Sequence, residues 1–423
     1  MISALSREWR FMLRQPYVLL LLACSFLVSG FSVVTGLNEV ASQNQVIERL
    51  KAADAIDRAE AQAKYDDPGS LAYYSFHLTY SEPTSLSFAA LGQRDVYPWK
   101  HRIRMLALEG QIYESDAQNA ELAQAGKIDF TFVISALAPL FVILLFHDLI
   151  ASERSSGRHD LLISTSQSVF QLWGARAIVR FVAIALCLIA PFYIGAWRSG
   201  TPLWDAVLVT FWCIIYFGFW ALLSVYFGRK VASAPRIASS LIGIWALFAF
   251  VIPVLGDLII EHSTHSPKGA DILLTQREAV NDAWDLPVEE TMNAFFVTHP
   301  EYKGYSKFAE GFAWEWYYAF QQVGDQVAQS LSQEYRAATF KKYDTAAYVS
   351  LISPPMLFQR AMNRRANTDT LAALEYESQI RQFHKSLRMF YYPWLFIEGA
   401  YDKTQLSELP QFDKNTKANK AKG

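Results

Sequence analysis

Apolar runs of about 20 residues alternate with long polar segments along this chain. A helix that crosses a bilayer needs about 20 apolar residues at about 1.5 Å rise per residue. Runs that meet this requirement lie at 17–37, 128–150, 177–197, 204–227 and 238–260. The pattern predicts an all-α polytopic membrane protein with five transmembrane helices.

A sixth apolar segment lies at 387–400, with the sequence LRMFYYPWLFIEGA. It is shorter than a span requires, and it contains Arg388, Pro393 and Glu398. We therefore expect it to lie at the membrane interface. A sixth crossing is the alternative.

Basic residues gather at one set of span ends, which predicts the orientation of the chain because cytoplasmic loops keep an excess of Lys and Arg. These residues are Arg7, Arg10, Arg14, Arg154, Arg158, Arg176, Arg180, Arg229, Lys230 and Arg236. The amino terminus is then cytoplasmic, and two large segments, 38–127 and 261–413, lie on the other side. The first apolar run could also be read as a signal peptide, but its length favours a retained anchor.

The polar segments show mainly helical spacing, which predicts five regions along the chain. Residues 1–37 form an elbow helix and the first span, and 38–127 form a first extracytoplasmic domain that starts with a helical stalk ending at 66–69. Residues 128–260 hold the other spans, with a cytoplasmic loop at 151–176. Residues 261–413 form a second extracytoplasmic domain, and 414–423 form a disordered tail.

Two further helices are predicted inside these extracytoplasmic segments. One covers about 99–124 and returns the chain to the membrane, and the other begins near an aromatic stretch and stops at the Ser-Pro-Pro of 353–355. The aromatic stretch contains Trp314, Trp316, Tyr317, Tyr318 and Phe320. We favour a core role for these rings over a ligand platform.

Composition agrees with spans joined to water-facing segments, since 52% of the 423 residues are hydrophobic and only 18% are charged. The formal net charge of −2 gives no basic surface, so nucleic acid is not an expected partner. Cys24, Cys187 and Cys213 all fall in predicted spans, where we expect them to pack as small apolar residues. Prolines at 139, 191 and 253 predict kinks, with pivot and packing roles both open.

The sequence contains no recognisable catalytic or nucleotide-binding constellation. The P-loop pattern, the GxSxG elbow and the HExxH motif are absent, and the spans hold no ionisable group near their middle. His262 and His265 favour a solvated loop over a metal site. We expect no enzyme activity, cofactor or metal in this chain, so energy for any work must come from another polypeptide.

The segment from Asp148 to Arg176 is the one substantial piece predicted on the cytoplasmic side. It carries an acidic residue, a basic residue, a glycine and paired leucines before a basic residue that opens the third span. These are Glu153, Arg154, Gly157, Leu161, Leu162 and Arg176. With the elbow REWRFMLRQP, the strip SLSFAALGQRDVYPW and the segment SLISPPMLFQRAMN, the chain resembles type-2 ABC transporter permeases of the multi-copper-enzyme-maturation-like branch, which have two large extracytoplasmic inserts and a domain of unknown function.

The resemblance implies a permease subunit of the bacterial inner membrane with periplasmic domains. Its partners would be a cytoplasmic ABC ATPase dimer carrying ATP and Mg, a second permease subunit that is a copy or a paralogue, membrane lipid, and an extracytoplasmic partner. The implied ATPase-coupling residues are Glu153, Arg154, Gly157, Arg158, Leu161 and Leu162. The implied extracytoplasmic motif is Gly92, Gln93, Arg94, Asp95, Tyr97 and Pro98. Arg158 departs from the family pattern, in which a small hydroxyl residue is usual, and the family commonly has six spans.

A different class of function is also compatible with the sequence. A membrane-anchored receptor or scaffold would use the same spans and exported segments to bind a partner without ATP-driven transport. An associated ATPase distinguishes the two.

Overall fold

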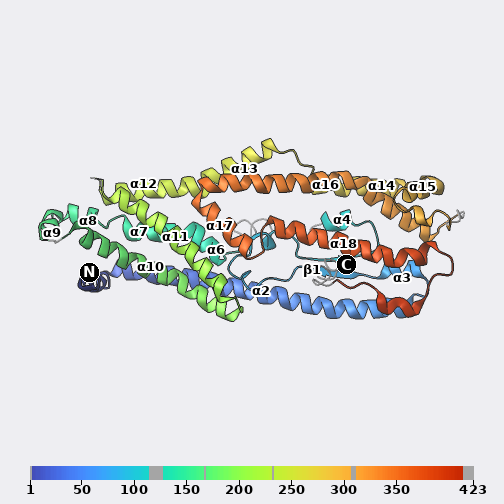
Figure 1. Cartoon of the computed structure of the whole chain (residues 1–423), viewed down its shortest axis with the longest axis horizontal. Helices are drawn as coiled ribbons and strands as arrows, with labels where there is room; N and C mark the ends of the chain where they lie inside the picture. Colours follow the sequence, from blue (N-terminus) through green and yellow to red (C-terminus); the bar gives the residue numbers. More distant parts are fainter. Residues whose placement is uncertain (1, 114–126, 166–167, 231–232, 306–310, 413–423) are drawn as a thin grey trace.

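The computed structural model describes residues 2–113, 127–165, 168–230, 233–305 and 311–412 and shows a long, mostly helical molecule (Figure 1). The amino terminus lies near one end, beside helices α8 and α9, and α15 lies at the other end. The predicted disordered tail at 414–423 falls outside the described residues.

The helices of the first half are α1 Ile2–Met12, α2 Pro16–Lys64, α3 Pro68–Tyr74, α4 Glu109–Tyr113, α6 Phe130–Phe132, α7 Ala138–Phe146, α8 Ala151–Ser155, α9 His159–Thr165, α10 Val169–Arg198 and α11 Leu203–Gly228. Those of the second half are α12 Ala234–Ala246, α13 Ile252–Ser263, α14 Gly269–Asp282, α15 Val288–Thr298, α16 Trp314–Ile352, α17 Pro354–Arg365 and α18 Thr370–Phe396. Short 3-10 turns are η1 Gly92–Asp95, η4 Pro300–Tyr302 and η5 Lys403–Glu408, and π-helical turns are η2 Val133–Leu137 and η3 Leu247–Val251.

Five helical segments in the described residues are long and apolar enough to cross a membrane, as the sequence predicts. They are Pro16–Lys64, Phe130–Ser155, Leu172–Arg198, Leu203–Gly228 and Ala234–Ser263. The second is the most buried, with 61% of its most apolar window inside the protein, and the fifth is the least, with 11%. The second segment is therefore central to this bundle and the fifth is peripheral.

Helix α2 runs without a break from the bundle into the other half of the molecule (Figure 1). It begins at Pro16, whose fixed φ and missing N–H suit a first helical position, and a short break separates it from the elbow helix α1. It ends at Lys64, just before the predicted stop at 66–69. The predicted stalk is thus the outer part of the first span's own helix.

Two of the three span prolines follow π-helical turns, and side chains from elsewhere in the chain donate hydrogen bonds to carbonyl groups nearby. Proline cannot donate to the carbonyl four residues earlier, so Pro139 leaves the Ser135 carbonyl free. The Tyr216 hydroxyl donates to it at 2.6 Å. Near Pro253, the Phe248 carbonyl accepts from the Ser353 hydroxyl at 2.8 Å. Hydrogen bonds between different helical segments therefore form beside both prolines.

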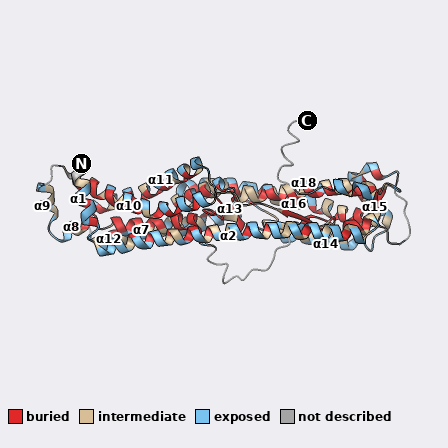
Figure 2. Ribbon diagram, turned by 90° about the horizontal axis from the view of Figure 1, so that it is seen from below, coloured by how far each residue is buried: buried red, intermediate tan, exposed pale blue. Residues whose placement is uncertain are grey.

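A second hydrophobic core lies away from the bundle core and includes residues from both predicted extracytoplasmic domains (Figure 2). Leu71 and Ile103 come from the first segment, and Phe295 and Tyr391 come from the second. All four are fully buried. The two segments therefore pack as one body, which we call the distal region.

A small sheet replaces the start of the helix predicted at 99–124. Strand β1, His77–Tyr80, pairs antiparallel with β2, Lys100–Ile103, so that His77 faces Ile103. The helix in this stretch is only α4, and 114–126 lie outside the described residues. The prediction is wrong over 99–108 because Tyr, Thr and His pairs favour extended backbone once a partner strand is present.

The segment 387–400 is not an interfacial helix in this structure. Residues 387–396 are the last part of α18, and Leu387, Tyr391 and Phe396 are buried in the distal core. Its apolar side chains serve internal packing, which a short apolar run cannot distinguish from membrane contact. The aromatic stretch of α16 has the core role that we expected, with Trp316, Tyr318 and Phe320 buried.

Candidate functional site

Helices α8 and α9 form a short hairpin at the end of the bundle, beside the amino terminus (Figure 1). Gly157 connects them with φ +70°, a left-handed backbone that favours glycine. The hairpin comprises the described part of the predicted coupling loop 151–176 ahead of α10. Residues 166–167 lie outside the described part of the chain.

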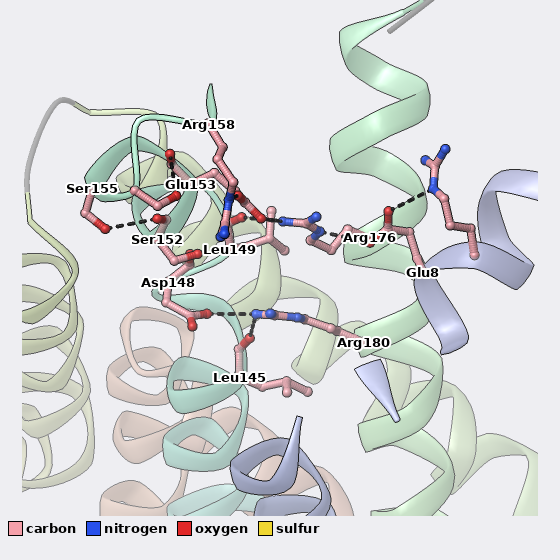
Figure 3. A network of polar contacts seen from close by, with 12 residues as sticks. Glu8, Leu145, Asp148, Leu149, Ser152, Glu153, Ser155, Arg158, Arg176 and Arg180 are labelled. Carbon is pink, nitrogen blue, oxygen red and sulfur yellow. Dashed lines mark hydrogen bonds and ion pairs between the residues drawn. The ribbon is translucent and has the colours of Figure 1, made fainter. Parts of the chain in front are cut away.

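Glu153, which the resemblance assigns to ATPase contact, points into the protein (Figure 3). Its side chain is only 6% exposed and lies between two arginines. Arg176 Nη1 donates to Glu153 Oε1 at 3.0 Å, and Arg158 Nε donates to Glu153 Oε2 at 2.9 Å. Glu153 thus fastens the hairpin to α10 and stabilises the turn at Gly157.

Arg176 connects this hairpin to the elbow helix α1. Its Nε donates to Glu8 Oε2 at 2.9 Å, and both side chains are more than nine-tenths buried. One guanidinium therefore bridges Glu8 and Glu153, and its planar fork suits two carboxylates (Figure 3). Removal of Arg176 would leave two buried carboxylates facing one another.

A parallel contact lies one turn deeper along α10. Arg180 Nη1 donates to Asp148 Oδ1 at 2.8 Å and also to the Leu145 carbonyl (Figure 3). Tyr17, at the start of α2, donates its hydroxyl to Asp148 Oδ2 at 2.9 Å. The end of the second span is thereby tied to the first and third spans.

The Arg154 side chain binds the carboxyl end of α11. Its guanidinium donates to the Lys230 carbonyl at 2.8 Å and the Arg229 carbonyl at 3.1 Å. The last carbonyls of a helix lack intrahelical partners and carry partial negative charge, which an arginine satisfies. Glu153 and Arg154, which we call the hairpin root, therefore contact α10 and the end of α11, and Arg176 extends the connection to α1. Asp148, just before the hairpin, contacts Tyr17 of α2.

The outer face of the hairpin is formed by α9. Leu161 is 64% exposed, whereas Leu162 is half-buried against the bundle core. Arg158 is also largely exposed, although it contacts Glu153. Of the six predicted coupling residues, Leu161 and Arg158 are therefore on the surface and Leu162 packs on the bundle core. Glu153 and Arg154 anchor the hairpin, and Gly157 shapes its turn.

Glu8, Asp148 and Tyr17 also belong to this network, although the sequence did not predict their roles. Glu8 is the only acidic residue among three arginines in the first 14 residues, which is a weak local signal of a buried partner. Its partner Arg176 is 168 residues away in the chain.

The predicted motif at Gly92–Pro98 lies where the bundle meets the distal region, not at an exposed tip. Arg94 is 9% exposed, and its Nε and Nη2 both donate to Gln43 Oε1, at 3.0 and 2.7 Å. Arg94 Nη2 also donates to the Ser81 carbonyl at 2.7 Å. Arg94 therefore ties the α2 stalk to the loop that follows β1.

The rest of this motif serves the same joint. Gly92 has φ +51°, and the Gln93 N–H donates to the Thr368 carbonyl at 2.7 Å. Asp95 Oδ2 accepts from the Lys127 N–H at 2.8 Å, and the Tyr97 hydroxyl lies 3.4 Å from that of Tyr335. Pro98 is exposed. The motif is thus a structural joint between α2, α16 and the α17–α18 turn.

Neither region carries a recognisable catalytic arrangement. Among the described residues, no group of three His, Cys, Asp or Glu side chains is placed to hold a metal ion. The buried charge pairs at the hairpin fix it to several helices at once.

Comparison with known proteins finds a similar family for the last third of the chain. A family described as a domain of unknown function (DUF3526) matches residues 271–414, which include most of α14 and all of α15 to α18. No curated protein and no solved structure matches the chain.

Proposed function

We propose that this chain is the permease (transmembrane) subunit of an ABC transporter. It would couple ATP hydrolysis by a separate ATPase subunit to substrate export, or to mechanical work on an extracytoplasmic partner. In this proposal the protein lies in a bacterial inner membrane, with the amino terminus and the α8–α9 hairpin cytoplasmic and the distal region periplasmic. A second permease subunit would complete the complex.

The observation that carries the proposal is the contrast between the two sides of the hairpin. Its outer face presents Leu161 to solvent, and its root is held by the buried bridge of Glu8, Arg176 and Glu153. A projection fastened in this way suits coupling, because a force applied at Leu161 would displace α1 and α10 together. The basic residues at this end support its cytoplasmic placement.

In this proposal Leu161 and Arg158 form the contact with the ATPase, and Glu153 and Arg154 carry the displacement into the bundle. The exposure of the first two and the contacts of the last two with α10 and α11 support these roles. An ATPase is proposed as the occupant because the chain has five apolar spans and no nucleotide motif of its own.

Site-specific photo-crosslinking in native membranes tests this function. A photoreactive amino acid replaces Leu161 in one variant and Val297, which is 81% exposed in the distal region, in the other. We expect the first variant alone to crosslink to a protein that mass spectrometry identifies by its Walker and signature motifs. The purified complex should hydrolyse ATP.

Two results would overturn the proposal. One is a crosslink from position 161 only to proteins without nucleotide-binding motifs, which would favour a receptor or scaffold. The other is an ATPase crosslink from position 297, which would reverse the predicted orientation.

A further inference from the structure

A polar cleft of about 680 Å³ lies in the distal region between α16 and α18, and neither the hairpin nor the joint motif uses it. Its floor includes Leu108 and Glu109, and η4 closes one end with Tyr302. This volume falls in the range of ligand sites in proteins, about 300 to 1,000 Å³.

One wall of the cleft is a stripe of glutamines on α16. Gln322, Gln326, Gln329 and Gln333 line it, and their spacing of four, three and four residues places them on one face of the helix. Helices usually turn an apolar stripe toward a neighbouring helix. Here primary amides, each able to donate and accept, face α18 instead.

Two of these amides are already engaged and two are not. The Tyr392 hydroxyl donates to Gln322 Oε1 at 3.3 Å, and Gln326 donates to the Thr298 hydroxyl. Gln329 and Gln333 are exposed, and no hydrogen bond of their amides is found among the described residues. The middle of the cleft therefore offers unpaired donors and acceptors.

The charges on the floor are paired with one another. Arg381 Nε donates to Glu109 Oε1 at 2.8 Å, and Arg388 Nη2 donates to Asp325 Oδ2 at 2.6 Å. Arg388 keeps a buried Nε that has no partner among the described residues. The floor is thus close to neutral and retains one unused donor.

The rim and the two ends differ in chemistry. Lys385 is exposed and has no ion pair among the described residues, and Arg336 lies toward the Ser332 end of the same cleft. At the opposite end, Tyr302 and Tyr392 have ring centroids 6.2 Å apart. The cleft is therefore basic from its middle to one end, and the other end is aromatic and also carries Glu301 and His299.

We propose that this cleft binds an extended peptide of about five residues, with a carboxylate toward Lys385 and Arg336 and an apolar or aromatic side chain toward Tyr302. The length follows from the stripe, since eleven residues of helix span about 16 Å and extended chain advances about 3.3 Å per residue. The glutamine amides would pair with the peptide's main-chain N–H and C=O groups. This site does not depend on ATP-driven transport.

A glycan fits these features less well. Sugars stack their C–H faces on aromatic rings, so a glycan site needs rings along its length. In this cleft the rings gather at one end, and the length of the wall is amide. The basic rim adds a preference for an acidic ligand.

Fluorescence anisotropy with the purified full-length chain in nanodiscs tests the proposal. The probes are the labelled pentapeptide Phe-Gly-Ser-Glu-Asp, its reversed sequence Asp-Glu-Ser-Gly-Phe, the charge-reversed Phe-Gly-Ser-Lys-Lys, and a labelled chitin pentasaccharide. We expect saturable binding of the acidic peptide whose chain direction fits the cleft, either Phe-Gly-Ser-Glu-Asp or its reverse. The lysine peptide should bind at least tenfold more weakly than that peptide.

Surface variants identify the site without disturbing the fold. Lys385→Glu should weaken the acidic peptide at least tenfold and improve the lysine peptide, and the Gln329→Ala, Gln333→Ala pair should weaken both. Lys341→Glu, exposed on α16 outside the cleft, should change neither. Binding of the saccharide alone, equal binding of acidic and basic peptides, absence of any binding, or equal effects of Lys385→Glu and Lys341→Glu would each overturn the proposal.

Discussion

The backbone carbonyl of Phe88 lies directly against Gly36 of helix α2. A Cβ atom added at Gly36 would be 1.9 Å from that carbonyl oxygen, far inside van der Waals contact. Phe88 is fully buried and stacks on Phe192 of α10, with ring centroids 5.9 Å apart. The strip before the Gly92 motif is thus inserted between the first and third spans.

This contact predicts that Gly36→Ala is destabilising. The methyl group would displace backbone atoms, so we expect a loss of about 1 to 3 kcal/mol, as overpacked sites show. Gly30→Ala in the same helix is the matched control, because nothing lies within 4 Å of its added Cβ. Thermal unfolding in detergent should show a lower midpoint for Gly36→Ala only. Equal midpoints for the two variants would contradict the close contact between Gly36 and the Phe88 carbonyl.

The two arginines on Glu153 should differ strongly in their contribution to stability. Arg176→Met removes the only buried cation between Glu8 and Glu153 among the described residues and leaves them the largely exposed Arg7 and Arg158 as partners, which we expect to cost about 3 kcal/mol. Arg158→Met removes a side chain that is 62% exposed, and the expected cost is below about 1 kcal/mol. Midpoints of unfolding in detergent measure both, and similar losses would show that the Glu8 bridge contributes little.

Arg94 should not tolerate lysine, although the charge is kept. A lysine ammonium cannot reproduce the forked contacts to Gln43 Oε1 and the Ser81 carbonyl, so we expect a loss of about 2 kcal/mol. Arg102→Lys is the control, since Arg102 forms a half-exposed pair with Asp57. Protease resistance of the purified chain should fall for Arg94→Lys and stay unchanged for Arg102→Lys. Unchanged resistance in both variants would show that Arg94 does not stabilise the contact between α2 and the loop that follows β1.

Acid should destabilise the distal region through its buried histidines. Burial lowers the pKa of His77 to about 3 and that of His101 to about 4. Protons therefore bind the unfolded chain first, so stability present above pH 6.5 is lost as the pH falls toward these values. Each histidine should cost about 2 kcal/mol at pH 5.

His77→Phe tests the origin of this pH dependence. The ring lies among the aromatic rings of Phe383 and Tyr391, and its Nε2 has no hydrogen-bond partner among the described residues, so phenylalanine should fit. Between pH 8 and pH 5 the midpoint should fall less in this variant than in the wild type. His265→Gln, at an exposed position, should leave the fall unchanged. A fall as large in His77→Phe as in the wild type would rule out His77 as a source.

The sequence predicts the parts of this fold that local patterns determine. The five spans, the end of α2 just before 66–69 and the end of α16 before Ser353 all follow from apolar length and proline. The pairing of β1 with β2 and the burial of Leu387 depend on partners distant in the chain. Local propensity cannot reveal such partners.

The candidate site shows the same division. Gly157 at a turn and Leu161 on a surface can be inferred from the loop itself. The inward direction of Glu153 cannot, because it depends on Arg176 and, through it, on Glu8. A charged pattern in a loop does not distinguish a residue that contacts a partner from one that anchors the loop.

The continuity of α2 has a geometric consequence for the whole molecule. Its 49 residues make a rod of roughly 74 Å at about 1.5 Å per residue. Tyr17 at one end contacts Asp148 beside the hairpin, and Asp54 near the other end accepts from the Leu78 N–H of strand β1. A tilt of about 5° at the inner end would displace the outer end by roughly 6 Å, so small tilts of the first span would produce displacements that grow with distance from the bundle.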